Sequence, residues 1–284
     1  MAEIGLLHPG EMGAAIGSAL VDRGHNVSWA SPGRSSASAD RARAAGLTDL
    51  GSLSTVLERC DVVLSVCPPH AAASLAAEVA GFRGHFVDAN AVSPATAAAI
   101  AERATGAGAT YTDGGIIGPP PARPGTTRLY LSGPAAPDVA ELFAGSRVEA
   151  IALPGEPFSA SALKMAFSAW NKGAQALLLA AQALARAGGV EDALAAEWDR
   201  ADGPAAHAPA HAGGQAARKG WRWSGEMEEI AAAMEAAGLP PGFHAAAADI
   251  YARAPADPGA AADAATLARV VDALLAGPAG GALA

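Results

Sequence analysis

Two glycines near the start of the chain lie between an apolar segment and an alanine-rich one. Residues 3–8 predict a short buried strand, and residues 11–20 predict a helix. Gly10 would let the backbone approach a phosphate, and Gly13 would let the helix pack close to the strand. The helix N-terminus adds N–H groups and a partial positive charge.

This strand, turn and helix predict a site for a dinucleotide pyrophosphate. The residues assigned to the turn are His8, Pro9, Gly10, Glu11 and Met12. The motif departs from the usual G-x-G-x-x-G pattern in one place, because His8 replaces the first glycine.

The residues after the second predicted strand bear on which dinucleotide binds. In domains that bind NAD, a carboxylate about 20 positions after the turn holds the ribose 2′-hydroxyl. No carboxylate directly follows residues 26–31 here, and Ser31 and Arg34 offer a hydroxyl and a guanidinium instead. A guanidinium can bind a 2′-phosphate through two hydrogen bonds. The segment favours NADP over NAD, and the alternative is that Arg34 is a solvated loop residue.

A lysine within an apolar segment is the second candidate for chemistry. Residues 157–187 predict one long helix that is apolar around most of its circumference, which is typical of a buried helix. Lys164, Ser168 and Asn171 recur at helical spacing and form a polar stripe. Two interpretations stay open at this point. Lys164 could give a proton to a carbonyl oxygen as a general acid, or the stripe could simply face solvent.

The elements that would position these residues divide the chain in two. Before Pro154, strand candidates alternate with alanine-rich helices, which predicts a doubly wound, mostly parallel sheet. The strand candidates are residues 3–8, 26–31, 61–67, 85–89, 110–112, 128–132 and 148–153. Only helical patterns follow. We therefore predict an α/β Rossmann domain at 1–154 and an all-α substrate and dimerisation domain at 155–284, connected by the long helix.

Composition excludes several classes of function. The chain has 284 residues and a net charge of −9, with no basic run, which argues against nucleic-acid binding. It has no signal peptide and no apolar run that could span a membrane, and Cys60 and Cys67 are expected to be free thiols, so we predict a cytoplasmic protein. His207 and His211 are four residues apart, but Pro209 argues against a helix there, and we predict no metal site.

Several segments, in this order, resemble the β-hydroxyacid dehydrogenase superfamily, which includes 3-hydroxyisobutyrate and 6-phosphogluconate dehydrogenases. The turn at 10–13 is similar to the family's cofactor turn. Residues 87–97 resemble its D-x-S-T-x-S-P-x-T-A segment, and residues 112–118 fall where it has D-A-P-V-S-G-G. The helix around Lys164 is similar to the family's catalytic-lysine helix. The resemblance covers essentially the whole chain and is closest to a poorly characterised bacterial phosphogluconate dehydrogenase-like branch.

The resemblance implies roles for further residues. Lys164 inherits the role of proton donor, Ser168 stands at the family's asparagine, and Asn171 on the same face could replace that asparagine. It also implies a homodimer and a small-molecule substrate. We expect Cys67, Pro68 and Asn90 to contact the cofactor. The residues expected to contact substrate are Ser93, Gly114, Gly115, Ile116 and Trp223. Trp223 could equally be a core residue.

Departures from the family pattern bear on the substrate. Ile117 aligns with the family's carboxylate-binding serine, Pro119 replaces a glycine, and a second family lysine falls at Gly225. A less polar pocket would suit a ketone, an aldehyde or an imine. The sequence therefore predicts an NADP(H)-dependent oxidoreductase for a small hydroxy or oxo compound. The alternatives are an imine reductase on the same fold and a non-catalytic NADP-binding protein.

Overall fold

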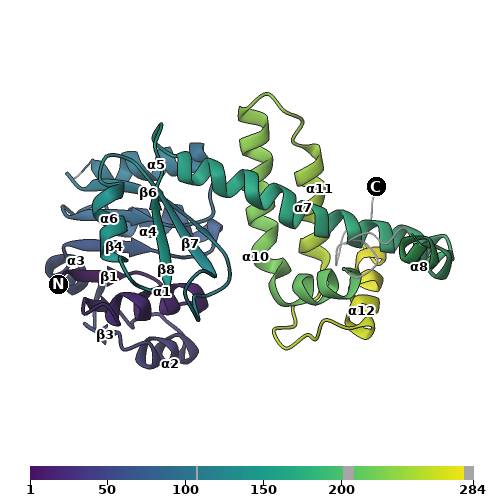
Figure 1. Cartoon of the computed structure of the whole chain (residues 1–284), viewed down its shortest axis with the longest axis horizontal. Helices are drawn as coiled ribbons and strands as arrows, with labels where there is room; N and C mark the ends of the chain where they lie inside the picture. The colour runs from purple at the N-terminus through teal and green to yellow at the C-terminus, as the bar shows by residue number, and fades with distance from the viewer. Residues whose placement is uncertain (107, 201–207, 278–284) are drawn as a thin grey trace. The chain divides into compact units, whose positions relative to one another are not determined.

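The computed structural model describes residues 1–106, 108–200 and 208–277. The chain divides into two compact units, Met1–Met165 (the sheet unit) and Ala166–Ala284 (the helical unit). The sheet unit is α/β, and the described part of the helical unit consists of helices, which confirms the predicted fold class (Figure 1). The division lies within helix α7 (Ser159–Ala187), so Lys164 belongs to the sheet unit and Ser168 to the helical unit.

The sheet unit contains one mostly parallel sheet. Within the described residues it has eight strands in the order β3-β2-β1-β4-β5-β6-β7-β8. Neighbouring strands are parallel except β6 and β7, which are antiparallel. The strands are β1 (Glu3–Leu6), β2 (Asn26–Trp29), β3 (Thr48–Asp49), β4 (Val62–Ser65), β5 (His85–Asp88), β6 (Thr110–Ile117), β7 (Thr127–Ser132) and β8 (Val148–Ala152).

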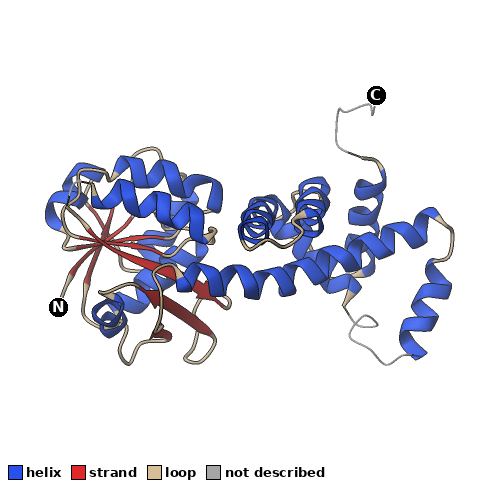
Figure 2. Ribbon diagram, turned by 90° about the horizontal axis from the view of Figure 1, so that it is seen from above, coloured by secondary structure: helices blue, strands red, loops and turns tan. Residues whose placement is uncertain are grey.

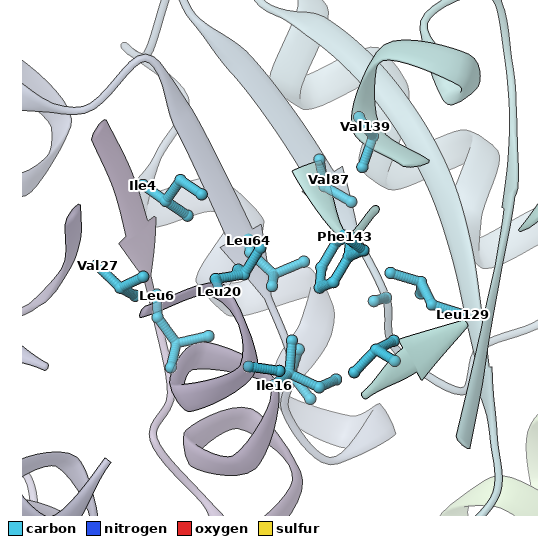
Figure 3. Close-up of a cluster of buried hydrophobic side chains, with 14 of the residues drawn as sticks. Ile4, Leu6, Ile16, Leu20, Val27, Leu64, Val87, Leu129, Val139 and Phe143 are labelled. Atoms are coloured by element: carbon cyan, nitrogen blue, oxygen red, sulfur yellow. The ribbon is translucent and has the colours of Figure 1, made fainter. Parts of the chain in front are cut away.

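Helices cover both faces of this sheet (Figure 2). One core cluster joins the sheet to α1, α2 and α6, and Figure 3 shows Ile16 and Leu20 of α1 with Leu64 and Leu129 of the sheet. A second cluster joins the other face to α4 and α5. The helices are α1 (Glu11–Val21), α2 (Ser36–Ala44), α3 (Leu53–Arg59), α4 (Pro69–Glu78), α5 (Pro94–Thr105) and α6 (Ala136–Leu142).

Two strands differ from their predictions. β6 continues to Ile117, five residues beyond its predicted end, because Gly114 and Gly115 lie within the strand and pair with β7. β3 was not predicted, because its two residues, Thr48 and Asp49, are polar and exposed. It is a strand only through its pairing with the end of β2.

The expected burial of the long helix is wrong. Helix α7 begins at Ser159 and ends at Ala187, close to its predicted limits. However, the side chains of Trp170 and Leu184 are 76% and 75% exposed, and those of Phe167 and Leu177 are also exposed. The helix is therefore buried along only part of its circumference.

Close helix packing organises the helical unit. A Cβ at Gly220 would lie 2.9 Å from the Tyr251 carbonyl oxygen, so α10 and α11 approach closely there. The helices after α7 are α8 (Glu191–Arg200), α10 (Pro209–Ala236), α11 (Gly242–Arg253) and α12 (Ala264–Leu275). Pro209 starts α10, so the expected loop at His211 is wrong, and His207 lies outside the described residues. Among the described helices none is long and apolar enough to cross a membrane.

Candidate functional site

The predicted cofactor residues follow the carboxyl ends of four adjacent strands. Ser31 follows β2, His8 follows β1, Cys67 follows β4 and Asn90 follows β5, and these strands are neighbours in the sheet. In open α/β sheets, ligands bind outside this edge. The structure therefore brings residues that are far apart in the sequence to one edge of the sheet.

The turn between β1 and α1 has the geometry of a phosphate cradle. Gly10 precedes α1 with an extended backbone, and no side chain among the described residues caps this helix. Its first N–H groups can therefore face a ligand. A Cβ at Gly13 would lie 2.2 Å from the His8 carbonyl oxygen, so only glycine fits where α1 contacts the end of β1. The structure thus explains Gly13 by close packing.

Two arginines flank this turn. Arg34 Nη2 donates to the Leu7 carbonyl oxygen at 3.2 Å, and Arg41 Nε donates to the Pro9 carbonyl oxygen at 3.3 Å. Burial lowers the pKa of His8, and the charges of Arg34 and Arg41 lower it further. Sequence reasoning missed Arg41. Its place on α2, three residues after Ser38, was a signal that these two side chains share one face of the helix. The edge at β1 and β2 is therefore cationic.

A carboxylate also reaches this edge, from β3. Asp49 Oδ1 accepts hydrogen bonds from the Ser31 N–H at 3.2 Å and from the Gly51 N–H at 2.9 Å. The hydrogen bond from the Ser31 side chain is the main reason that the pKa of Asp49 is lowered. Ser31 is therefore engaged with an ionised carboxylate, which the sequence analysis did not foresee because β3 is so short.

An adjoining pocket of about 90 Å³ lies between the ends of the strands and helices α3 and α4. Its lining is mostly apolar, with one guanidinium and one carboxylate. The lining residues are Leu6, Leu7, Ala30, Pro32, Arg34, Leu53, Val56, Leu75 and Glu78. Arg34 thus contributes both to this pocket and, through its hydrogen bond to Leu7, to the start of the turn.

Asn90 connects the ends of β4 and β5. Its Oδ1 accepts from the Cys67 N–H at 2.6 Å, and its Nδ2 donates to Ser65 Oγ at 2.9 Å and to Asp88 Oδ1. Burial raises the pKa of the Cys67 thiol to about 12, so this sulfur is protonated at neutral pH and is not a nucleophile. Burial also raises the pKa of Asp88 to about 7.

Two further predicted residues start helices at the same edge. Pro68 directly precedes α4, and Ser93 directly precedes α5. The Ser93 hydroxyl accepts a hydrogen bond from the Thr96 N–H at 3.2 Å. Ser93 is thus an N-cap residue.

Lys164 lies against strand β6. A Cβ at Gly115 would lie 3.1 Å from Lys164 Cβ and 2.7 Å from the Ala160 carbonyl oxygen. A Cβ at Gly114 would lie 3.1 Å from the Asp88 carbonyl oxygen. Gly114 and Gly115, which were expected to contact substrate, thus permit close approach of β6 to its neighbours. The Ile116 side chain, from the same segment, is part of the buried core.

The remaining predicted residues lie in the helical unit. Ser168 Oγ donates to Glu226 Oε1 at 2.7 Å, and Glu226 forms an ion pair with Lys172. Lys172 Nζ lies 5.2 Å from the centre of the Trp223 ring, which is buried. Asn171 is exposed, and its amide donates to the Phe167 carbonyl oxygen of its own helix. Ser168 and Trp223 therefore share one buried cluster, and Asn171 lies outside it.

Two family models match the chain. Residues 3–95 match the model described as NADP oxidoreductase coenzyme F420-dependent. Residues 185–254 match a domain of unknown function, DUF1932. No curated protein matches the sequence.

Solved structures resemble the chain over nearly its full length. The conserved protein MTH1747, of unknown function and described as similar to 3-hydroxyacid dehydrogenases, is 25% identical, with a TM-score of 0.64 over 96% of this chain and 98% of that one. The 3-hydroxyisobutyrate dehydrogenase of Mycobacterium tuberculosis is 22% identical, with a TM-score of 0.69 over 96% and 99%. A reductive aminase from Aspergillus terreus, solved with NADPH and ethyl levulinate, is 19% identical, with a TM-score of 0.56 over 96% and 99%.

These likenesses agree with the geometry of the sheet unit. The match at residues 3–95 contains the turn at His8–Gly13 and both flanking arginines. The match at residues 185–254 covers α8, α10 and α11 of the helical unit. The two family models and the solved structures together support the resemblance to the β-hydroxyacid dehydrogenase superfamily.

Proposed function

We propose that this protein is an NADP(H)-dependent oxidoreductase acting on a small hydroxy or oxo compound, with Lys164 as the proton donor or acceptor. The observation that carries the proposal is the contact of Lys164 with Gly115 of β6. This strand neighbours β5, and β4 and β1 follow in the same sheet. The ends of these three strands carry predicted cofactor residues. A phosphate cradle and a lysine thus belong to the same edge of one sheet.

The residues present fit NADP. The uncapped start of α1 and the close approach at Gly13 suit the pyrophosphate. Arg34 and Arg41 offer guanidinium donors for a 2′-phosphate. Two likenesses agree with this assignment, because one family model is described as an NADP oxidoreductase and the reductive aminase was solved with NADPH. NAD is the less favoured cofactor.

The chemistry assigned to the chain itself is proton transfer. When bound, NADPH would supply the hydride for the carbonyl carbon of the substrate. The Lys164 ammonium gives a proton to the carbonyl oxygen, so that the C=O double bond becomes an alcohol. In the reverse direction the neutral Lys164 amine accepts the hydroxyl proton. Ser168 and Asn171 stay predictions as assisting residues.

Imine reduction is the second candidate. The likeness to a reductive aminase favours it, and so does the buried, apolar Ile117 at the position of the family's carboxylate-binding serine. In that reaction the same lysine would protonate nitrogen. A non-catalytic NADP-binding protein is the remaining alternative, and it predicts cofactor binding without turnover.

A homodimer and a cytoplasmic location also stay predictions. The exposed side chains of Phe167, Trp170, Leu177 and Leu184 recur at helical spacing on one face of α7. A contiguous apolar face of this kind commonly marks a protein interface. We expect Trp170→Asp to convert a dimer to a monomer in analytical ultracentrifugation. Trp221→Asp, at another exposed tryptophan, is the matched control.

The first experiment is a pair of fluorescence titrations, with NADPH and with NADH. We expect tighter binding of NADPH, and a preference for NADH would overturn the assignment of Arg34. Turnover is then measured with 3-hydroxyisobutyrate and L-serine in the oxidising direction, and with ethyl levulinate or cyclohexanone plus allylamine in the reducing direction. Lys164→Met should bind NADPH normally and lose turnover. Undiminished turnover in this variant would contradict the proton-transfer role.

A further inference from the structure

The start of helix α7 is held by side chains from the sheet. Asp113 Oδ2 accepts a hydrogen bond from the Ser161 N–H at 2.9 Å, and Asp113 Oδ1 accepts one from Ser161 Oγ at 2.5 Å. Ser132 Oγ accepts from the Ala160 N–H at 3.0 Å and donates to Asp113 Oδ2 at 2.9 Å. Asp113 is on β6 and Ser132 is its partner on β7. These three buried residues, Asp113, Ser132 and Ser161, form the α7 anchor.

The α7 anchor replaces an ordinary helix cap. The first N–H groups of a helix lack partners within the helix, and the residue before the helix usually supplies one. That residue is Phe158 here, whose side chain has no acceptor. The Ser159 N–H bonds to the Glu156 carbonyl oxygen, and the Ala162 N–H bonds to the Phe158 carbonyl oxygen. The two N–H groups between them, those of Ala160 and Ser161, bond to the anchor.

Two other features restrict the same helical turn. Phe158 has a φ of 67°, which is uncommon for an aromatic residue, and its ring lies 6.2 Å from that of Tyr111 on β6. Gly115, also on β6, leaves space for the Ala160 carbonyl oxygen in the first turn of α7 and for Lys164 Cβ in the next turn. The connection into α7, its first N–H groups and its contact with the sheet therefore all involve residues of β6, with Ser132 of β7 as the further partner.

We propose that Asp113 is a positioning residue for Lys164, which acts by fixing the first turn of α7 on strand β6. Lys164 is three residues after Ser161, so its amine is placed by the turn that Asp113 holds. The carboxylate suits this role because Ser132 and Ser161 both donate to it and because negative charge is favourable at a helix N-terminus. The functional part of this inference rests on the proposed role of Lys164.

The test variant is Asp113→Asn, which keeps the size of the side chain and replaces one acceptor oxygen by a donor. The matched control is Asp138→Asn, at an exposed aspartate in the first turn of α6. Ser132→Ala is the second variant, in case Asp113→Asn does not fold. Because the chain has only three lysines, Lys164, Lys172 and Lys219, ¹³C-methylation gives resolvable NMR signals for each.

We expect Asp113→Asn to shift or split the Lys164 signal while the Lys172 and Lys219 signals stay in place. Hydrogen exchange of the Ala160 and Ser161 amides should become faster, and Asp138→Asn should change neither readout. Unchanged exchange or an unchanged Lys164 signal in both Asp113→Asn and Ser132→Ala would overturn the proposal. These readouts require no substrate, so they decide on the anchor even if the proposed reaction is wrong.

Turnover tests the functional part. Misplacement of a reacting group by about 1 Å can cost about 100-fold in rate, so we expect Asp113→Asn to lower kcat by about 10-fold to 100-fold with little change in KM. In a Lys164→Met background the same substitution should have no further effect. An equal loss in both backgrounds would overturn a role through Lys164. Full activity of Lys164→Met alone would instead overturn the proposed function.

Discussion

The two ends of the candidate site differ in how far their charged side chains are exposed to solvent. At β2 and β1, Arg34 and Arg41 are half-buried, and the Asp49 side chain is exposed. At β5 and β6, Asp88 and Asp113 are buried on directly paired positions of neighbouring strands. A buried charge loses its hydration, whereas an exposed one keeps it. We therefore expect charges at the buried end to affect stability and positioning, and charges at the exposed end to affect the binding of an anion.

The largest effect is expected at the buried end, for Asp88→Asn. Burial raises the pKa of Asp88 to about 7, so the folded state favours the protonated carboxyl. Such a group stabilises the fold fully below its unfolded pKa of about 4, and the contribution is lost as pH rises through about 7. At pH 8, Asp88→Asn should therefore raise the free energy of unfolding by about 2–4 kcal/mol.

Urea denaturation at pH 5 and at pH 8 measures this difference. The gain should be much smaller at pH 5, because wild-type Asp88 is then largely protonated. The exposed Asp61, which precedes β4 at the opposite edge of the sheet, gives the control Asp61→Asn, for which we expect a change within about 0.5 kcal/mol. Equal effects of Asp88→Asn at both pH values would contradict the raised pKa of Asp88 and the contrast between the buried and exposed ends of the site.

At the exposed end, Arg34→Ala should weaken binding and leave stability nearly unchanged. Loss of a charge-assisted contact to the 2′-phosphate is expected to raise the Kd for NADPH by about 10-fold to 100-fold. The Kd for NADH should change by less than about 3-fold, because NADH lacks that phosphate. Fluorescence titration with both cofactors measures the ratio. An equal loss for NADPH and NADH would show that Arg34 supports the turn through Leu7 and does not read the 2′-phosphate.

Arg41→Ala should act in the same direction but less strongly. Arg41 already donates to Pro9 and to Ser38, so fewer of its five donors can reach a ligand. We expect a rise in the NADPH Kd of about 3-fold to 10-fold, with a weaker dependence on salt than in the wild type. Titrations at low and at high salt provide the measurement. Arg43→Ala, at an exposed arginine of the same helix, should have no effect.

The smallest effect is expected for Asp49→Asn, which should tighten the binding of NADPH by about 2-fold to 5-fold. The ionised carboxylate accepts the Ser31 N–H and repels a nearby phosphate. Asp40→Asn, at an exposed aspartate of α2, is the control. Weaker binding of NADPH in Asp49→Asn would mean that the carboxylate helps the site by orienting Ser31.

The sequence predicted the parts of the site that depend on local spacing. The glycine turn needs Gly10 and Gly13 at fixed positions after a strand, and helical periodicity alone located Lys164 on a helix. The contacts that were missed join distant segments. Asp113 and Ser161 are 48 residues apart, and Asp49 reaches Ser31 only because β3 pairs with β2.

The sequence showed that α7 is apolar, which is one ground for the expected dimer, but it did not show which of its side chains are exposed. An apolar residue type is compatible with burial in the same chain and with burial at an interface. The sequence of α7 therefore does not show which other elements cover its apolar side chains. Trp170 and Leu184 are exposed in the single chain. The proposed dimer would cover them, and a sequence read as one chain does not include that partner.

The contact at Gly115 has a consequence for how such a protein could change over generations. Because the backbone of β6 meets α7 there without an intervening side chain, the distance between β6 and α7 at this contact is not set by the size of a β6 side chain. Under the proposed function, substitutions elsewhere along α7 or around the pocket would change which compound is accepted. The Lys164 Cβ would stay in place against Gly115. Under that proposal, Gly115 would thus let the accepted substrate change while the proposed proton-transfer group keeps its place.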